Sequence, residues 1–386
     1  MKNVKSRALA ASALSGALVL ALAACGSDAV PQEEPTSPAE TSTTDAPTET
    51  DEPAAPEASG SIAGAGASSQ EKAMEGWIAT LTSVAPNLTV SYDPVGSGGG
   101  RTQFLSGAAQ FAGSDSALKE EELAQAVDRC YGGEALELPL YISPIAVVYN
   151  LPSVDAEHIN LDAETIANVF SGKITKWNDP AIAAQNEGVE LPDLAIIPVN
   201  RSDESGTTEN FTEYLEAASN GAWEHEASGD WPISGTQSGN GTSGMIDTVK
   251  GAEGTIGYAD ASRAGDLGTI ALKVGENYVP FSAEAAAAVV DASPRAEGAT
   301  DKRLVVELDR NTSAAGAYPL VLISYSVACS VYETAEEATN VKAFLNYVAS
   351  TEGQAIAAQA DVAGSAPISD TLRGEVTAAI DAITSK

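Results

Sequence analysis

The residue types best suited to chemistry lie together at positions 199–211, which read VNRSDESGTTENF. An apolar run before them predicts a buried strand, and apolar residues at helical spacing after them predict a helix. Residues 205–207 then open that helix, where the first N–H groups are unpaired and carry a partial positive charge. Arg201 adds a guanidinium fork that matches a tetrahedral oxyanion, and Asp203 is close enough to pair with the fork and fix its direction. The stretch therefore predicts a site for a small oxyanion.

Three similar polar turns occur before residue 120. Ser68 and Ser69 precede a helical pattern, Ser97 lies in the glycine-rich turn GSGGGR, and Asp115 ends another apolar segment. Alternating strands and helices predict an α/β fold, and open parallel sheets bind ligands at the carboxyl ends of their strands. One such turn alone is typical of a helix cap. The recurrence of four favours a shared binding site.

The sequence lacks the usual signatures of catalysis and metal binding. It contains no GxSxG, HExxH or CxxC motif, and its only histidines, His158 and His225, are far apart. The turn with Ser97 also departs from the dinucleotide pattern GxGxxG, because Arg101 stands at the last glycine. We therefore expect no metal, no cofactor and no enzymatic activity. An exported phosphatase or serine hydrolase that uses Ser97 or Ser205 stays open, because its base could come from a distant part of the chain.

The charge balance excludes some partners. The chain has 54 acidic and 20 basic residues, which gives a formal net charge of -34. Such a charge argues against binding to nucleic acid and against electrostatic docking on anionic lipid. It also opposes the approach of a free anion. Any anion site must therefore depend on short-range hydrogen-bond donors.

The first 24 residues have the pattern of a signal peptide. A basic start is followed by a short apolar run and by the sequence LAAC, which ends at Cys25. This ending resembles a bacterial lipobox and implies that Cys25 carries a lipid anchor to the cell membrane, outside the cytoplasm. An ordinary secreted protein is the alternative. Residues 25–59 are rich in Pro, Thr, Ser, Ala and acidic side chains, which predicts a disordered linker.

Two cysteines remain for the folded part of the chain. Cys130 and Cys329 form an even pair in an oxidising compartment, which favours a disulfide. Two buried free thiols are the alternative.

Two strongly apolar segments, at residues 136–150 and 318–325, predict long strands that cross between two lobes. They bracket the middle of the chain, so the first lobe is expected to be discontinuous. We place lobe 1 at residues 60–140 plus 320–386 and lobe 2 at residues 141–319.

Seven short motifs, in their order and spacing, resemble the phosphate-binding protein of the Pst-type phosphate ABC importer. They are GAGAS (64–68), GSGG (96–99), GSD (113–115), KITKW (173–177), RSDESGT (201–207), WPI (231–233) and GTIGY (254–258). The resemblance implies a two-lobe Venus-flytrap periplasmic binding protein of type II, with a mixed sheet flanked by helices in each lobe. It also implies delivery of inorganic phosphate to an ABC permease and its ATPase subunits. We further expect a monomer that is held to the membrane by its lipid anchor only.

Carried over position by position, the resemblance assigns the family's phosphate ligands to eight residues of this sequence. They are Ser68, Ser69, Ser97, Asp115, Arg201, Ser205, Gly206 and Thr207, with Asp203 supporting Arg201. Two positions depart from the family pattern. Ser68-Ser69 replaces the usual Thr-Phe, so Ser69 is expected to act through its backbone N–H. Glu204 replaces a glycine, and we expect its side chain to point into solvent, because a carboxylate that faces the anion would repel it.

Asp115 explains how such a site could be selective. An ionised carboxylate only accepts hydrogen bonds, so it can accept the proton of hydrogen phosphate. Sulfate has no proton at neutral pH and would leave this acceptor unpaired, at a cost of ~1–3 kcal/mol or more. A site of the same fold for another oxyanion, such as sulfate or molybdate, is the alternative that Asp115 argues against.

Overall fold

The computed structural model describes residues 57–386. The predicted signal peptide, Cys25 and the linker up to residue 56 lie outside the described residues. Ser59, predicted to lie in the linker, is already the first residue of β1 (Ser59–Gly66). Its backbone N–H donates to the Asn340 side chain at 2.9 Å, and its carbonyl accepts from the same side chain. This pairing fixes the start of the strand.

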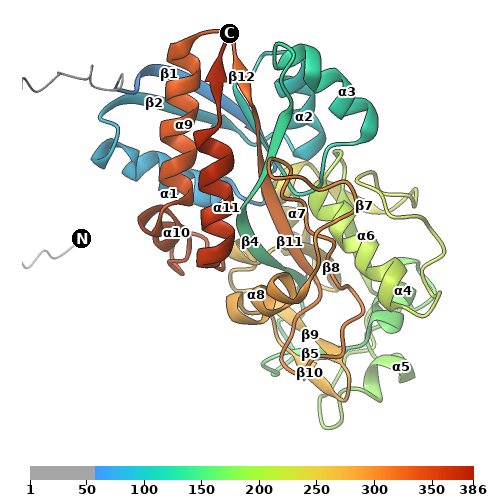
Figure 1. The fold of residues 1–386 in the computed structure, drawn as a ribbon. Coiled ribbons are helices and arrows are strands. Elements are labelled where there is room, and N and C mark those ends of the chain that lie inside the picture. Colours follow the sequence, from blue (N-terminus) through green and yellow to red (C-terminus); the bar gives the residue numbers. More distant parts are fainter. Residues whose placement is uncertain (1–56) are drawn as a thin grey trace, which may run out of the picture. The chain divides into compact units, whose positions relative to one another are not determined.

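The described chain alternates strands and helices through most of its length (Figure 1). The further strands are β2 (Asn87–Asp93), β3 (Phe111–Ser114), β4 (Ala135–Tyr149), β5 (Ile159–Leu161), β6 (Ile197–Arg201), β7 (Gln237–Gly239), β8 (Thr255–Asp260), β9 (Gly268–Val274), β10 (Asn277–Val279), β11 (Val321–Cys329), β12 (Val331–Tyr332) and β13 (Thr384–Ser385). The α-helices are α1 (Glu71–Thr80), α2 (Ser97–Leu105), α3 (Glu120–Arg129), α4 (Ala163–Phe170), α5 (Pro180–Ala183), α6 (Gly206–Ala218), α7 (Gly241–Lys250), α8 (Ala283–Ala292), α9 (Ala335–Ala349), α10 (Thr351–Ala357) and α11 (Asp370–Asp381), and two short 3-10 turns are η1 (Leu81–Ser83) and η2 (Ala261–Arg263).

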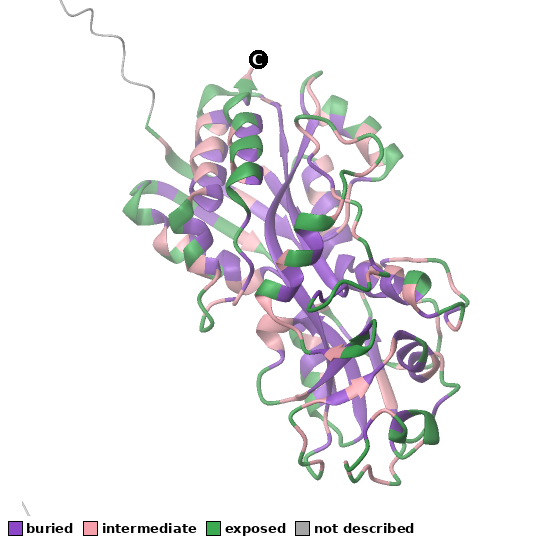
Figure 2. Cartoon of the chain, turned by 60° about the horizontal axis from the view of Figure 1, so that its bottom comes forward, coloured by how far each residue is buried: buried purple, intermediate pink, exposed green. Residues whose placement is uncertain are grey.

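The long strands β4 and β11 form the middle of an 11-stranded sheet whose main path is β2-β1-β3-β11-β4-β8-β6-β7. Every residue of both strands is buried, as Figure 2 shows for the strands at the centre of the molecule. Strands covered on both faces read as continuous apolar runs, which is the pattern of the two predicted crossover segments. The first part of β4 pairs with β11, and residues 145–149 pair with β8. The two strands therefore connect the two ends of the sheet.

We call strands β2, β1 and β3 the β1 half of the sheet, and strands β8, β6 and β7 the β6 half. Within each half the strands run parallel. Helices α2 and α9 pack on β1 and α1 packs on β2, whereas α7 packs on all three strands of the β6 half. The carboxyl ends of β1, β2, β3 and β6 lead directly into the four polar turns singled out in the sequence.

The predicted elements agree with the structure at most positions. The helix expected after residue 205 is α6, and the apolar crossovers are β4 and β11, the latter beginning at Val321. The hairpin of β9 and β10 was not predicted from the sequence, and β9 also pairs with β5 and with the end of β4. Among residues 57–386, no helix is long and apolar enough to cross a membrane.

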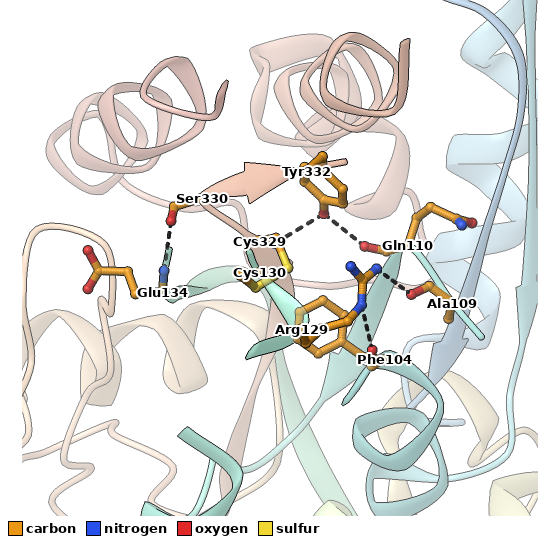
Figure 3. The surroundings of a disulfide bond; sticks show 9 residues. All are labelled: Phe104, Ala109, Gln110, Arg129, Cys130, Glu134, Cys329, Ser330 and Tyr332. Atoms are coloured by element: carbon orange, nitrogen blue, oxygen red, sulfur yellow. Dashed lines mark hydrogen bonds between the residues drawn. A yellow bond between two sulfur atoms is a disulfide. The ribbon is translucent and has the colours of Figure 1, made fainter. Parts of the chain in front are cut away.

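Cys130 and Cys329 form a disulfide (Figure 3). It joins the end of α3 to the end of β11, and both cysteines are completely buried. The neighbouring Tyr332 hydroxyl donates to the Gln110 carbonyl at 2.8 Å and accepts from the Cys329 N–H. The bond therefore lies in a packed and hydrogen-bonded part of the core, and it closes a loop across 199 positions of sequence.

Replacing both cysteines by alanine should lower the free energy of unfolding by about 3 to 5 kcal/mol, because the cross-link restricts the unfolded chain over a long loop. Denaturant unfolding followed by tryptophan fluorescence measures this difference. Wild-type protein with the bond reduced should unfold at nearly the same denaturant concentration as the double variant. An unchanged unfolding free energy would contradict a stabilising role for the bond.

Candidate functional site

The polar turns before α1, α2 and α6 meet around Asp115, which follows β3. Asp115 is only 4% exposed. Its carboxylate accepts from the Ser69 hydroxyl at 2.7 Å and from the Thr207 hydroxyl at 2.9 Å, and its N–H donates to the Ser97 hydroxyl at 3.2 Å. Its carbonyl accepts from the Asn210 side chain at 2.7 Å. Segments from both halves of the sheet are thus brought together at one carboxylate.

Burial raises the pKa of Asp115 above its ordinary value. The hydrogen bonds from Ser69 and Thr207 and the charge of Arg201 act in the opposite direction but do not outweigh the burial. Both carboxylate oxygens already accept one hydroxyl hydrogen each. A carboxylate offers about four acceptor positions, so this group can still accept a further hydrogen bond from a protonated oxygen of a ligand.

Arg201 is the buried cation of the site, at 3% exposure. Its Nε donates to Asp203 Oδ1 at 2.8 Å and its Nη2 donates to Oδ2 of the same carboxylate. Asp203 Oδ1 also accepts from the Gly241 N–H at 3.0 Å. Burial acts to raise the pKa of Asp203, but the hydrogen bonds and the charge of Arg201 outweigh it and hold that pKa below its ordinary value. This pairing fixes the guanidinium and leaves its other N–H groups for a ligand.

The start of α6 provides backbone donors. Ser205 is the N-cap, and its hydroxyl accepts from the Thr208 N–H at 3.2 Å. The N–H groups of Gly206 and Thr207, in the first turn of the helix, have no intrahelical acceptor and carry the positive end of the helix dipole. The Ser205 hydroxyl can still donate its own hydrogen.

Ser68 is buried beside the start of α7 rather than on Asp115. Its hydroxyl accepts from the Thr242 N–H at 3.0 Å and lies 3.0 Å from the Thr242 hydroxyl. Ser68 belongs to the turn after β1 and Thr242 to a helix on the β6 half, so this contact also joins the two halves. Ser69, expected to act through its backbone N–H, has a second role here because its hydroxyl bonds to Asp115.

The expectation for Glu204 is wrong in part. Its side chain is 39% exposed, but its Oε1 accepts from Arg101 Nη2 at 2.9 Å and from Lys119 Nζ at 3.2 Å. A carboxylate next to two cations gains more from pairing than from hydration alone, and this explains why the side chain does not simply extend into solvent.

Four residues of the site were missed in the sequence: Asn210, Gly241, Thr242 and Tyr258. Asn210 lies one helical turn after Gly206, so the spacing of four positions predicts that both lie on the same face of α6. The Tyr258 hydroxyl bonds to the Thr208 hydroxyl at 2.8 Å. Gly241 and Thr242 come from a separate segment, and no local signal connects that segment to Ser68 or Asp203.

The donors and acceptors suit a small, proton-bearing oxyanion. Helix N-termini, serine and threonine hydroxyls and one guanidinium supply donors, and Asp115 supplies a buried acceptor. Among residues 57–386 there is no group of three His, Cys, Asp or Glu side chains that could hold a metal ion. His158 bonds to the Thr269 hydroxyl, and His225 packs on Trp223. Both described histidines thus have partners other than Ser97 and Ser205.

A family model described as the PBP superfamily domain matches residues 51–352. The chain is 35% identical over 327 residues to the phosphate-binding protein PstS2 of Mycobacterium bovis (strain BCG / Pasteur 1173P2), covering 82% of this chain and 86% of that protein. The chain belongs to the PBP superfamily and to its PstS family. It is also 35% identical over 322 residues to phosphate-binding protein PstS 3 of Mycobacterium tuberculosis (strain ATCC 25618 / H37Rv), covering 82% and 85%.

A solved structure of the same fold is the phosphate-binding protein of Stenotrophomonas maltophilia. It superposes with a TM-score of 0.65 at 20% identity, covering 83% of this chain and 94% of that one. A high-affinity periplasmic phosphate-binding protein, solved with bound phosphate, has a TM-score of 0.66 and 20% identity, covering 83% and 93%. These likenesses confirm the predicted fold class, a two-lobe α/β fold with a mixed sheet and flanking helices.

Proposed function

We propose that this PstS-family protein is the extracytoplasmic substrate-binding component of a phosphate ABC importer. The observation that carries the proposal is a buried carboxylate, Asp115, placed among hydroxyl, backbone and guanidinium donors. A site built only of donors would suit any oxyanion. The added acceptor suits hydrogen phosphate, whose proton it can accept.

The proposed phosphate ligands are the residues that line this carboxylate and the helix N-termini around it. They are Ser68, Ser69, Ser97, Asp115, Arg201, Ser205, Gly206 and Thr207, with Asp203 holding Arg201 in direction. The donation from Thr207 to Asp115 supports this set, because it joins α6 to the turn after β3 across the two halves of the sheet.

The mechanism is binding without a chemical step. We assign residues 60–140 plus 320–386 to lobe 1 and residues 141–319 to lobe 2, with β4 and β11 as the connection. Phosphate would meet donors from both lobes, so it bonds fully only when they are closed and thereby shifts the equilibrium to the closed form. The closed form would then deliver phosphate to the permease and its ATPase subunits.

The remaining parts of the proposal concern location and partners. Cys25 would be lipidated, so the monomeric protein would stay at the outer face of the cell membrane through its anchor, without contact to nucleic acid. The protein would not be an enzyme and would need no cofactor. A binding protein for sulfate or molybdate is the alternative, and a test of selectivity separates it from phosphate binding.

Titration calorimetry with phosphate and with sulfate, after bound ligand is stripped, tests the proposed function. Phosphate should bind and release heat, while sulfate should give no signal at neutral pH because it would leave Asp115 without a donor. Equal binding of both anions would keep the fold and discard the selectivity mechanism. Silence with both, together with turnover of a chromogenic phosphate ester, would favour a hydrolase instead.

Asp115→Asn should weaken phosphate binding and allow sulfate to bind. The amide offers a donor where sulfate meets a repelling carboxylate, so discrimination should fall by about tenfold to a hundredfold, corresponding to ~1–3 kcal/mol. Competition titrations measure the ratio of the two dissociation constants. A variant that keeps wild-type selectivity would contradict the role of this acceptor.

Because burial raises the pKa of Asp115, acidification of the wild type should reproduce part of the gain in sulfate binding that is expected for Asp115→Asn. The carboxyl group gains its proton as pH falls, and the protonated form can donate to sulfate. Sulfate affinity should therefore rise with falling pH in the wild type and stay nearly flat in the variant. Parallel pH profiles for both proteins would argue against Asp115 as the group responsible.

Arg201→Ala should raise the dissociation constant for phosphate by about a hundredfold, because a charge-assisted hydrogen bond in a buried site is worth ~1.5–3 kcal/mol. The protein should remain folded, with unchanged far-ultraviolet circular dichroism. Arg295→Ala serves as the control, since Arg295 pairs with Glu375 away from the site. Unchanged affinity in Arg201→Ala would remove Arg201 from the proposed ligands.

A further inference from the structure

Arg101 is a buried cation outside the proposed ligand set. It lies on α2 at 1% exposure, and all of its described partners are polar. Its Nε donates to Glu122 at 2.9 Å, and its Nη1 donates to the hydroxyls of Ser114 and Ser116 at 3.1 and 3.0 Å. These four residues all belong to the β1 half and its helices. They hold the guanidinium in one orientation whether or not the β6 half is near.

The remaining donor of Arg101 reaches across to the other half. Its Nη2 donates to Glu204 Oε1 at 2.9 Å, and Lys119 Nζ donates to the same oxygen at 3.2 Å. Glu204 lies between β6 and α6, directly before the N-cap Ser205. The Glu204 carbonyl also accepts from the Gly98 N–H at 3.4 Å. One residue of the β6 half thus contacts three residues of the β1 half.

The glycine at position 98 makes room for this contact. A Cβ atom added to Gly98 would lie 2.2 Å from Glu204 Oε2 and 2.8 Å from Glu204 Cβ. The side chain of Glu204 therefore lies against the first turn of α2, in space that a larger residue than glycine would fill. The contact requires that the two halves be as close as they are in this structure.

From this geometry we infer that Glu204 is a positioning residue for ligand retention: it locks the closed form by pairing with Arg101 and Lys119 across the two halves. The inference rests on the proposed function, because it names what slows the release of phosphate. When the halves separate, Arg101 keeps Glu122 and both serines, whereas Glu204 loses its partners. The ion pair therefore contributes to the closed form only.

The local charges explain how a carboxylate can lie next to an anion site. Burial acts to lower the pKa of Lys119, but the hydrogen bond and charge of Glu204 outweigh it and hold that pKa above its ordinary value. Arg101 and Lys119 carry two positive charges, and Glu122 and Glu204 carry two negative ones. Two cations in direct contact with Glu204 therefore weaken its repulsion of a bound anion, and Glu209 is a third carboxylate whose charge acts on the same two cations.

The test compares phosphate release from the full-length protein in detergent micelles for the wild type, Glu204→Gln, Lys119→Gln and the double variant. Glutamine keeps the shape of Glu204 and removes its charge, so release should become about five- to tenfold faster. Lys119→Gln should accelerate release about twofold, because Lys119 is half-exposed. The double variant should match Glu204→Gln alone, since Lys119 has then already lost its partner.

The salt dependence of release separates this role from a purely structural one. Added salt screens an ion pair, so it should speed release from the wild type more than from Glu204→Gln. Glu224→Gln is the matched control, because Glu224 pairs with Lys173 at 2.8 Å and both residues belong to the same proposed lobe. Its release rate should equal that of the wild type. Unchanged or slower release from Glu204→Gln, or additive effects in the double variant, would overturn the inference.

A wild-type protein that binds no phosphate would contradict the proposed function. The contact of Glu204 across the two halves can then still be tested by hydrogen exchange in phosphate-free buffer. Amides of residues 97–105 and 203–210 should exchange faster in Glu204→Gln than in the wild type, while those of α9 should not change. Equal exchange in the first two segments would overturn the locking role of Glu204.

Discussion

The buried carboxylate of Asp115 is the constraint on which the rest of the site depends. A charge removed from water is unfavourable unless hydrogen bonds replace its hydration. Here Ser69 supplies one bond from the β1 half and Thr207 supplies another from the β6 half. The full set of donors exists only when the two halves are close. The approach of the two halves therefore also completes the hydrogen bonding of this carboxylate. A ligand that donates a further hydrogen bond to Asp115 stabilises the same arrangement.

The close approach of the halves sets the residue type at the start of α6. A Cβ atom on Gly206 would lie 2.6 Å from the Ser97 hydroxyl and 2.7 Å from Asp115 Cβ. Any side chain there would push α6 away from the opposite turn and separate the donors from the acceptor. The glycine is thus explained by contact between the two halves, while its N–H serves as a donor of the helix N-terminus.

The sequence predicted the parts of the molecule that depend on local patterns. Continuous apolar runs predicted β4 and β11, helical periodicity predicted α6, and polar turns after strands predicted the positions of Asp115 and Arg201. The hairpin of β9 and β10 is itself local, with Val274 paired to Asn277, but the pairing of β9 with β4 and β5 depends on distant strands and has no local signal. The pairing of Glu204 and the contact of Thr242 were not predicted for a related reason. Their partners, Arg101 and Ser68, are 103 and 174 positions away, and only the folded chain brings them together.

The cations around the site produce little net positive potential. Arg201 is neutralised by Asp203, and Arg101 is shared between Glu122 and Glu204. In a chain with a formal net charge of -34, such pairing leaves little long-range attraction for an anion. What remains is short-range: helix N–H groups, hydroxyls and the free edge of one guanidinium. Recognition of this kind depends on the positions of individual hydrogens, and a single buried acceptor can therefore decide between anions of the same shape and size.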